Sequence, residues 1–159
     1  MAATSKPAPA GYHTLTPYLT INGAAKAIDF YKSIFGASER MRMETPDGRV
    51  GHAELAIGDA VIMLSDEWPD MGCKGPEALG GSPVSLHVYV DDVDAVADRA
   101  VAAGATLKRP PKDEFWGDRM GTIVDPFGHV WLIATHVEDV PEGEMGRRAE
   151  AAMREMCGE

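Results

Sequence analysis

The sequence is poor in cysteine and in long apolar runs. Its two cysteines, Cys73 and Cys157, are too far apart for a CxxC motif or a small disulfide scaffold, which is typical of a reducing cytoplasm. No stretch approaches the ~18 uninterrupted apolar residues of a membrane helix. The segment 1–12 also lacks the apolar core of a secretory signal. We therefore expect a cytoplasmic protein with no membrane partner and a disordered leader over residues 1–12.

Basic side chains are scarce as well. The 159 residues include 15 Lys and Arg against 25 Asp and Glu, which gives a formal net charge of −10. Such a chain repels a phosphate backbone, and its basic residues form no long run, so nucleic-acid binding is not expected. What the chain does have is a hydrophobic content of 45%, enough to bury the core of one ordinary domain.

The first half of the chain predicts a β-α-β-β-β unit. A strand is expected at Thr16–Ile21. Asn22 is predicted to cap a helix whose apolar residues follow the helical period until Gly36. Three further strands are predicted at Glu39–Glu44, Val50–Ile57 and Ala60–Leu64.

The second half predicts the same order again. A strand at Val84–Val90 precedes a helix that Asp92 caps and Gly104 ends. Further strands are predicted at Thr106–Arg109, Met120–Val124 and His129–Thr135. Gly36 and Gly104 lie 68 residues apart, and Gly51 and Gly121 lie 70 apart, which indicates an internal duplication.

The predicted fold class is α+β. A single domain over 13–137 is expected to contain two tandem βαβββ modules, at about 14–66 and 83–136, joined by a Pro/Gly-rich crossover. The curved mixed sheets would enclose a central cleft, with the helices outside. Strand alternation turns a mixed polar and apolar set toward this cleft: Tyr18, His52, Glu54, Met63, Ser85, His87 and Leu132. Such a lining suits a small-molecule pocket.

Residues 138–159 predict a C-terminal amphipathic helix. Met145, Ala149, Ala152 and Met156 follow one another at spacings of four, three and four, which places them in one apolar stripe. The stripe needs a partner, either on its own subunit or on a second copy. The sequence leaves both open.

Three motifs carry a resemblance to a known family. They are Ala27-Ile-Asp-Phe-Tyr31, Tyr89-Val-Asp-Asp-Val93 and Asp125-Pro-Phe-Gly-His129. With the duplicated plan, they resemble the vicinal oxygen chelate superfamily, which includes glyoxalase I and bleomycin-binding proteins. The strings Gly80-Gly-Ser-Pro-Val-Ser-Leu-His87 and Phe115-Trp-Gly-Asp-Arg119 are similar to its PhnB-like branch. The resemblance implies the fold and a homodimer, but one fold hosts many reactions.

The resemblance also places the superfamily's metal ligands in this chain. Metal-dependent members use His or Glu on the first and last strands of each half, and the matching positions here are Thr16, Met63, Ser85 and Leu132. None is an imidazole or a carboxylate, and Met and Leu are poor ligands for the divalent ions of this superfamily. We therefore expect neither the superfamily's metal nor another cofactor.

Two residues are the first choices for chemistry. Glu54 and His87 could form an acid–base pair, or they could join His52 in a displaced two-histidine, one-carboxylate metal site. The alternative is a hydrogen-bonded polar cluster without a reaction. A third alternative is a scaffold whose cleft is filled by its own side chains.

The leading prediction is a small-molecule-binding protein that sequesters an antibiotic or metabolite. Its ligand would be partly aromatic or amphipathic, stacked on Tyr18 and Trp116 and gripped by Arg119. Trp116 could equally be an aromatic lid, with Asp118 and Arg119 as a surface pair. The full set of predicted ligand contacts is Tyr18, His52, Glu54, Met63, Ser85, His87, Trp116, Arg119 and Leu132.

Overall fold

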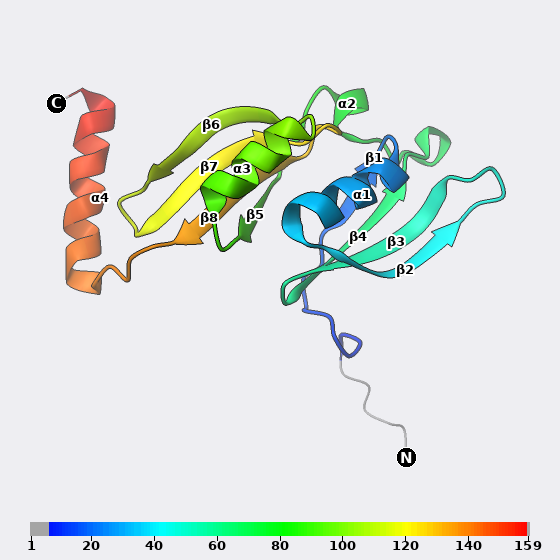
Figure 1. Cartoon of the computed structure of the whole chain (residues 1–159), viewed down its shortest axis with the longest axis horizontal. Coiled ribbons are helices and arrows are strands. Elements are labelled where there is room, and N and C mark those ends of the chain that lie inside the picture. The colour runs from blue at the N-terminus through cyan, green and yellow to red at the C-terminus, as the bar shows by residue number, and fades with distance from the viewer. Residues whose placement is uncertain (1–6, 159) are drawn as a thin grey trace, which may run out of the picture. The chain divides into compact units, whose positions relative to one another are not determined.

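The computed structural model describes residues 7–158, and the chain divides into two compact units, Met1–Gly81 and Ser82–Glu159 (Figure 1). Half of the predicted leader, residues 1–6, lies outside the described residues. Residues 7–12 form bends and turns. None of the helices in the described part of the chain is both long and apolar enough to cross a membrane.

The first unit contains one mixed four-stranded sheet and its covering helix. In chain order its elements are β1 (Tyr18–Ile21), α1 (Ala24–Phe35), β2 (Ser38–Glu44), β3 (Val50–Ile57), β4 (Ala60–Asp66), the 3-10 turn η1 (Pro69–Met71) and the short helix α2 (Pro76–Leu79). The strand order is β1-β4-β3-β2, with β1 parallel to β4 and the other pairs antiparallel.

The second unit has the same topology. Its elements are β5 (Ser85–Tyr89), α3 (Val93–Ala102), β6 (Thr106–Asp113), β7 (Asp118–Val124), β8 (Val130–His136) and α4 (Glu142–Cys157). The order β5-β8-β7-β6, with β5 parallel to β8, matches the order in the first unit. The predicted α+β fold of two βαβββ modules is thereby confirmed.

Strand pairing fixes how the two modules correspond. Met63 pairs with Tyr18 and Glu54 in the first sheet. Leu132 pairs with His87 and Thr122 in the second. The equivalent residues are therefore 68 or 69 positions apart. Between β3 and β7 the offset is 68, so the predicted match of Gly51 with Gly121, at an offset of 70, is wrong by two residues.

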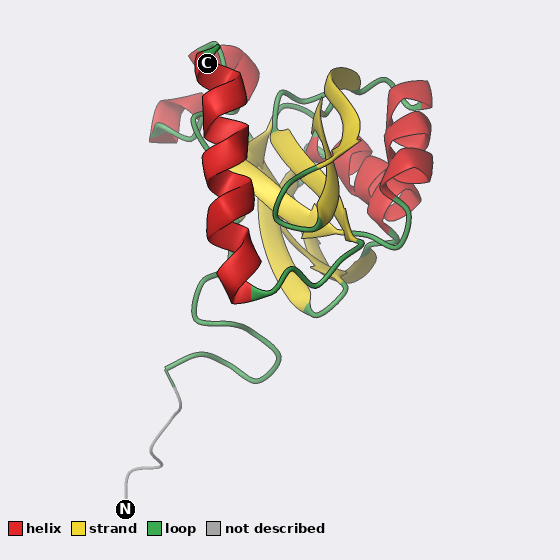
Figure 2. Ribbon diagram, turned by 90° about the vertical axis from the view of Figure 1, so that its left-hand side faces the viewer, coloured by secondary structure: helices red, strands yellow, loops and turns green. Residues whose placement is uncertain are grey.

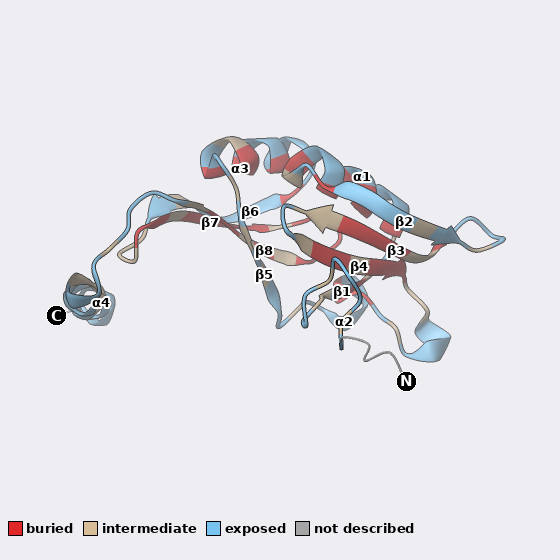
Figure 3. Cartoon of the chain, turned by 90° about the horizontal axis from the view of Figure 1, so that it is seen from below, coloured by how far each residue is buried: buried red, intermediate tan, exposed pale blue. Residues whose placement is uncertain are grey.

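Each sheet packs one face against the helix of its own module. In the first, α1 buries Ala27, Ile28, Tyr31 and Ile34, and the strands bury Leu19, Ile21, Leu55 and Leu64. Figure 3 shows strands of this sheet beneath α1, with their buried residues in red. Because side chains alternate along a strand, the neighbours of these residues lie on the other face of the sheet. That face, opposite the module's helix, is called the distal face below.

The start of α1 is held by a residue from another strand. Gly23, not Asn22, is the N-cap, at φ +92°, and no side chain of its own segment caps the helix. Instead, Asp66 Oδ1 accepts the N–H groups of Gly23 at 3.0 Å and Ala24 at 2.9 Å. The prediction for Asn22 is wrong because the parallel pairing of β1 with β4 places Ile21 beside Asp66 and so brings this carboxylate to the helix.

In the second module, a residue near the end of β8 holds the start of α3 in the same way. Thr135, 69 residues after Asp66, accepts the N–H of Val93 through Oγ1 at 2.9 Å. Here the predicted cap is also present, since Asp92 accepts the N–H of Ala95 at 3.0 Å. In both modules, therefore, the end of the last strand anchors the start of the helix.

Candidate functional site

The distal face of the first module carries a buried carboxylate. The register Tyr18–Met63–Glu54 places these three side chains in one row across β1, β4 and β3. His52 lies two residues before Glu54 and shares its face. Glu54 is 6% exposed, whereas Tyr18 is 52% exposed. A ligand that approaches this face would therefore meet the Tyr18 ring before it meets the carboxylate.

A chain of hydrogen bonds holds Glu54 in place. The Tyr12 hydroxyl donates to Glu54 Oε2, and His52 Nε2 lies 3.4 Å from Glu54 Oε1. On its other side, His52 Nδ1 lies 3.1 Å from the Tyr18 hydroxyl, and the two ring centroids are 5.6 Å apart. Both contacts are satisfied when Nε2 donates to Glu54 and Nδ1 accepts the Tyr18 hydroxyl. The order is thus Tyr18–His52–Glu54–Tyr12, with an aromatic ring at each end.

These contacts set the protonation of the carboxylate. The hydrogen bond from Tyr12, and less so the one from His52, holds the pKa of Glu54 below its usual range despite burial. The same bond to Glu54 raises the pKa of Tyr12. Glu54 is therefore a firmly ionised carboxylate at neutral pH, which makes it a weak general base.

Sequence reasoning missed Tyr12, which it placed in the leader. The Arg40 guanidinium lies over the Tyr12 ring, 4.5 Å from its centroid, and fixes the ring against β2. No short-range motif predicts the contact of Tyr12 with Glu54, because 42 residues separate them. Tyr12 and His13 precede the first predicted strand and form no recognisable motif, so the contact with Glu54 could not be predicted from them.

The distal face of the second module carries an aromatic pair. His87 and Tyr89 stand two apart on β5, and their ring centroids are 4.8 Å apart at 45°. Leu132 is paired with His87 and is half-buried, whereas Ser85 at the start of β5 is exposed. Glu54 and His87 belong to different units, so their predicted acid–base pairing stays a prediction.

A second buried carboxylate lies in this module. Asp118 is 4% exposed, and its Oδ2 accepts the Tyr89 hydroxyl and Trp116 Nε1, each at 3.0 Å. Its Oδ1 lies 2.8 Å from His136 Nδ1, and His136 Nε2 lies 3.0 Å from Asp139. Sequence reasoning missed this cluster, because its last predicted strand ends at Thr135, before His136, and Asp118 enters only as an alternative surface partner of Arg119. The spacing of Trp116 and Asp118 is the one local signal that pointed to it.

The hydrogen bonds around Asp118 shift the pKa values of Asp118, His136 and Tyr89. Burial acts to raise the pKa of Asp118, but hydrogen bonds from His136, Tyr89 and Trp116 outweigh it and hold the pKa below its usual value. The bonds to Asp118 and then Asp139 raise the pKa of His136. The bond to Asp118 likewise raises the pKa of Tyr89. The cluster is therefore built around an imidazole held between two carboxylates, which favour its protonated form.

Arg119 has partners on the opposite side of its strand. Its Nε and one terminal nitrogen bind the Asp94 carboxylate at 2.7 and 2.8 Å, and the other terminal nitrogen binds Asp113 at 3.0 Å. Asp94 belongs to α3, so Arg119 lies on the helix side while Asp118 lies on the distal side. Trp116, in contrast, packs its ring on Phe115 at 4.9 Å. Trp116 is thus bonded to Asp118 and Arg119 to Asp94, and their predicted contact with one ligand stays a prediction.

The four positions of the superfamily's metal ligands do not offer suitable donors. Met63 and Leu132 occupy the centres of their sheets, and Ser85 starts β5. Thr16 precedes β1, and its Oγ1 lies 3.4 Å from the carbonyl oxygen of His13. Among residues 7–158, no three His, Cys, Asp or Glu side chains gather where they could hold a metal ion. The side chains at these four positions therefore do not fit a divalent ion. The displaced site of His52, Glu54 and His87 draws on both units and stays a prediction.

Comparison with known proteins identifies the relatives of this chain. It is 45% identical over 135 residues to an uncharacterized protein of Mycobacterium tuberculosis, covering 82% of this chain and 79% of that protein. The crystal structure of TioX from Micromonospora sp. ML1 is similar at 28% identity and a TM-score of 0.61, over 79% of this chain and 99% of that one. A PhnB protein from Bacillus cereus, 19% identical with a TM-score of 0.62 over 77% and 99% of the two chains, shares the fold.

A family model extends this likeness to nearly the whole described domain. The model that matches is described as the glyoxalase/bleomycin resistance protein/dioxygenase superfamily, and it matches residues 12–133. These residues include the first module, the second module as far as Ile133 in β8, the Glu54 cluster and most of the Asp118 cluster. The chain therefore belongs to the glyoxalase/bleomycin resistance protein/dioxygenase superfamily.

Proposed function

We propose that this protein binds a small, partly aromatic or amphipathic molecule on the distal faces of its sheets, without the divalent metal of the superfamily's metalloenzymes. The observation that carries the proposal is the row Tyr18–His52–Glu54–Tyr12, in which a buried, ionised carboxylate lies behind a half-exposed aromatic ring. Such a row offers a stacking surface and a fixed hydrogen-bond acceptor, the two elements that orient a ligand in an apolar pocket.

The lowered pKa of Glu54 favours binding over acid–base catalysis. An efficient general base has a pKa near the working pH, whereas the bond from Tyr12 moves the pKa of Glu54 away from neutrality. Sequestration of an antibiotic or metabolite is the use that fits a protein that holds its ligand without changing it. The homodimer and the cytoplasmic location stay predictions.

The second candidate is an enzyme of the isomerase, lyase or glyoxalase type. One observation favours it: Tyr18 and Glu54 hold His52 from both ring nitrogens, an arrangement that orients an imidazole for proton transfer. In this reading Glu54 and His87 act as acid and base, or they hold a metal together with His52.

The test begins with protein purified without chelator. Native mass spectrometry identifies any co-purified ligand, and plasma mass spectrometry measures Zn, Ni, Mn and Fe. We expect a bound organic molecule and a substoichiometric metal content. One equivalent of metal that is lost in His87→Ala would overturn the metal-free proposal.

Variants of Tyr18 and Glu54 then separate the two candidates. For a ligand identified in this way, Tyr18→Phe keeps the ring, whereas Tyr18→Ala removes it and is expected to weaken binding by about tenfold, the equivalent of one stacked ring. Glu54→Gln is expected to retain much of the binding. If it abolishes conversion of the ligand while leaving affinity intact, the enzyme reading holds instead.

A further inference from the structure

The C-terminal helix α4 has an apolar side but buries none of its residues. Figures 1 and 3 show it standing clear of the sheet of its own unit, and Figure 2 shows it running straight to the C-terminus. Met153 is 63% exposed and Met156 is 86% exposed. A helix of 16 residues is marginal in water without tertiary packing, and Gly143 and Gly146 weaken it further. The apolar side of α4 therefore needs a partner.

The apolar side has the pattern of a helix pair. Met145, Ala149, Ala152 and Met156 follow at spacings of four, three and four, so they lie within an arc of about 60°. This is the alternation of the two apolar positions of a heptad repeat. The stripe is bordered on one flank by Gly146 and Met153, and on the other by Arg148 and Glu155.

We propose that α4 pairs antiparallel with the α4 of a second copy of this chain. A two-fold axis between Ala149 and Ala152 would set Ala149 against Ala152 of the second copy, and Met145 against Met156 of the second copy. The pair then has four layers of facing residues, two of methionine against methionine and two of alanine against alanine. The alanines at the centre let the two helices approach closely, while the methionines fill the ends.

The flanks of the stripe select the antiparallel arrangement. In that arrangement Arg148 meets Glu155 of the second copy on one flank. On the other flank Met153 lies against Gly146 of the second copy, where the absent side chain leaves room. A parallel pair would instead set Arg148 beside Met153 and would give Glu155 no basic neighbour. Charge and size therefore agree on one orientation.

Arg148 is already fixed on its flank. Its terminal nitrogens bind the Glu138 carboxylate at 2.7 and 2.8 Å, and its Nε binds Glu144 at 2.8 Å. The contact with Glu155 of the second copy adds orientation more than affinity, because Arg148 is neutralised within its own chain. The remaining charged pair, Glu150 and Arg154 at 2.6 Å, lies on the side away from the stripe.

The pair is expected to be reversible. Its four layers span about 17 Å, and two heptads are fewer than the three or four of a self-sufficient coiled coil. The full chain should therefore exchange between monomer and dimer with concentration. Sedimentation velocity on a dilution series measures this exchange directly.

Two neighbouring alanines provide matched variants. Ala152 lies in the stripe, whereas Ala151 is exposed beside it. Ala152→Glu is expected to raise the dimer dissociation constant at least tenfold, and Ala151→Glu, which adds the same charge one residue earlier, to leave it unchanged. A wild-type chain that stays monomeric at every concentration overturns the proposal. So does a dimer that resists Ala152→Glu, or one that Ala151→Glu weakens equally.

Cross-linking tests the orientation and does not depend on how well Ala152→Glu folds. Chains with Cys73 and Cys157 replaced by Ser carry either Ala149→Cys or Ala152→Cys, and equal amounts are mixed and oxidised. The antiparallel pair predicts mixed disulfides in clear excess over like-with-like ones, as read by peptide mass spectrometry. An excess of like-with-like disulfides, or no cross-link at concentrations where the dimer sediments, overturns it.

Discussion

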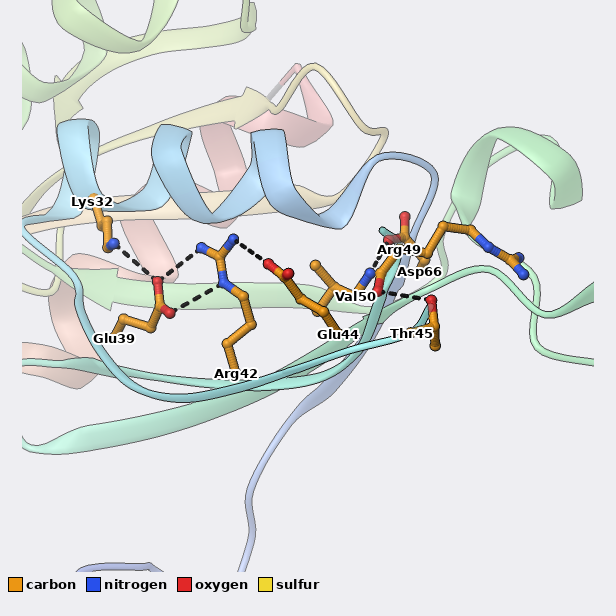
Figure 4. A network of polar contacts seen from close by, with 8 residues as sticks. All are labelled: Lys32, Glu39, Arg42, Glu44, Thr45, Arg49, Val50 and Asp66. Atoms are coloured by element: carbon orange, nitrogen blue, oxygen red, sulfur yellow. Dashed lines mark hydrogen bonds and ion pairs between the residues drawn. The ribbon is translucent and has the colours of Figure 1, made fainter. Parts of the chain in front are cut away.

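The Asp66 carboxylate accepts the N–H of Val50 at 2.7 Å through Oδ2 (Figure 4), while its other oxygen caps α1. One buried side chain at the end of β4 thus joins the start of β3 to the start of the helix. Replacing Asp66 with Ala leaves the N–H groups of Gly23, Ala24 and Val50 without this acceptor. We expect a loss of about 3 kcal/mol in the free energy of unfolding, because hydrogen bonds to a charged group and buried unpaired donors both carry large costs.

Urea denaturation of the full chain measures this loss. The matched control is Asp29→Ala, which removes an exposed carboxylate from the same helix and is expected to change stability by about 0.5 kcal/mol or less. Asp66→Asn, which keeps one acceptor oxygen, should fall between the two. Equal stability of the Asp66→Ala and Asp29→Ala variants would contradict the anchoring role.

A second prediction concerns the pH dependence of His136. Its hydrogen bonds to Asp118 and then Asp139 raise its pKa in the folded chain above the usual value of 6.5. The imidazolium therefore stabilises the fold fully below the unfolded pKa, and this contribution is lost as the pH rises through the folded pKa. An NMR titration of the His136 ring should give a raised pKa, and Asp118→Asn should lower it more than Asp139→Asn. A ring that titrates at or below 6.5 contradicts the cluster.

The strand and helix pattern could be predicted because it is local. The alternation in Val50–Ile57 and the Asp92 cap are confirmed to the residue. The prediction for β6 stopped at Arg109, but the strand continues to Asp113 through Pro110 and Pro111. It can do so because β6 is an edge strand, where a missing N–H breaks no ladder on the free side.

The polar clusters could be predicted only in part, because they depend on contacts between distant segments. His52 and Glu54 share a face through simple alternation, and their proximity follows from the sequence. Tyr12 reaches Glu54 across 42 residues, and His136 reaches Asp118 only through the pairing of β7 with β8. For Arg119, the residue type and the strand alternation point to different partners. Its charge suggested a ligand contact, but alternation from Asp118 turns it toward α3.

The place of Arg119 leads to a third prediction. Because Asp94 and Asp113 bind its guanidinium on the helix side of the sheet, Arg119→Gln is expected to leave ligand affinity unchanged within about twofold, like other substitutions of surface ion pairs. Trp116, whose Nε1 donates to Asp118, is on the distal side, so Trp116→Phe should weaken binding more. Calorimetry with the ligand identified by native mass spectrometry makes the comparison. A large loss in Arg119→Gln would restore the contact that the sequence predicted.

The Tyr12 hydroxyl controls the charge on Glu54, which gives a fourth prediction. Because its bond is the largest cause of the lowered pKa of Glu54, Tyr12→Phe should raise that pKa toward 4.5. A depressed carboxyl pKa adds stability above the unfolded pKa and loses it as the pH falls through the folded pKa. The variant should therefore lose less stability than the wild type on acidification below pH 4.5. Carbon-detected NMR of the Glu54 carboxyl measures the pKa, and Tyr18→Phe, which alters only the far end of the row, is the control. If Tyr18→Phe shifts the pKa of Glu54 more than Tyr12→Phe does, charge is set through His52 and not by the segment before β1.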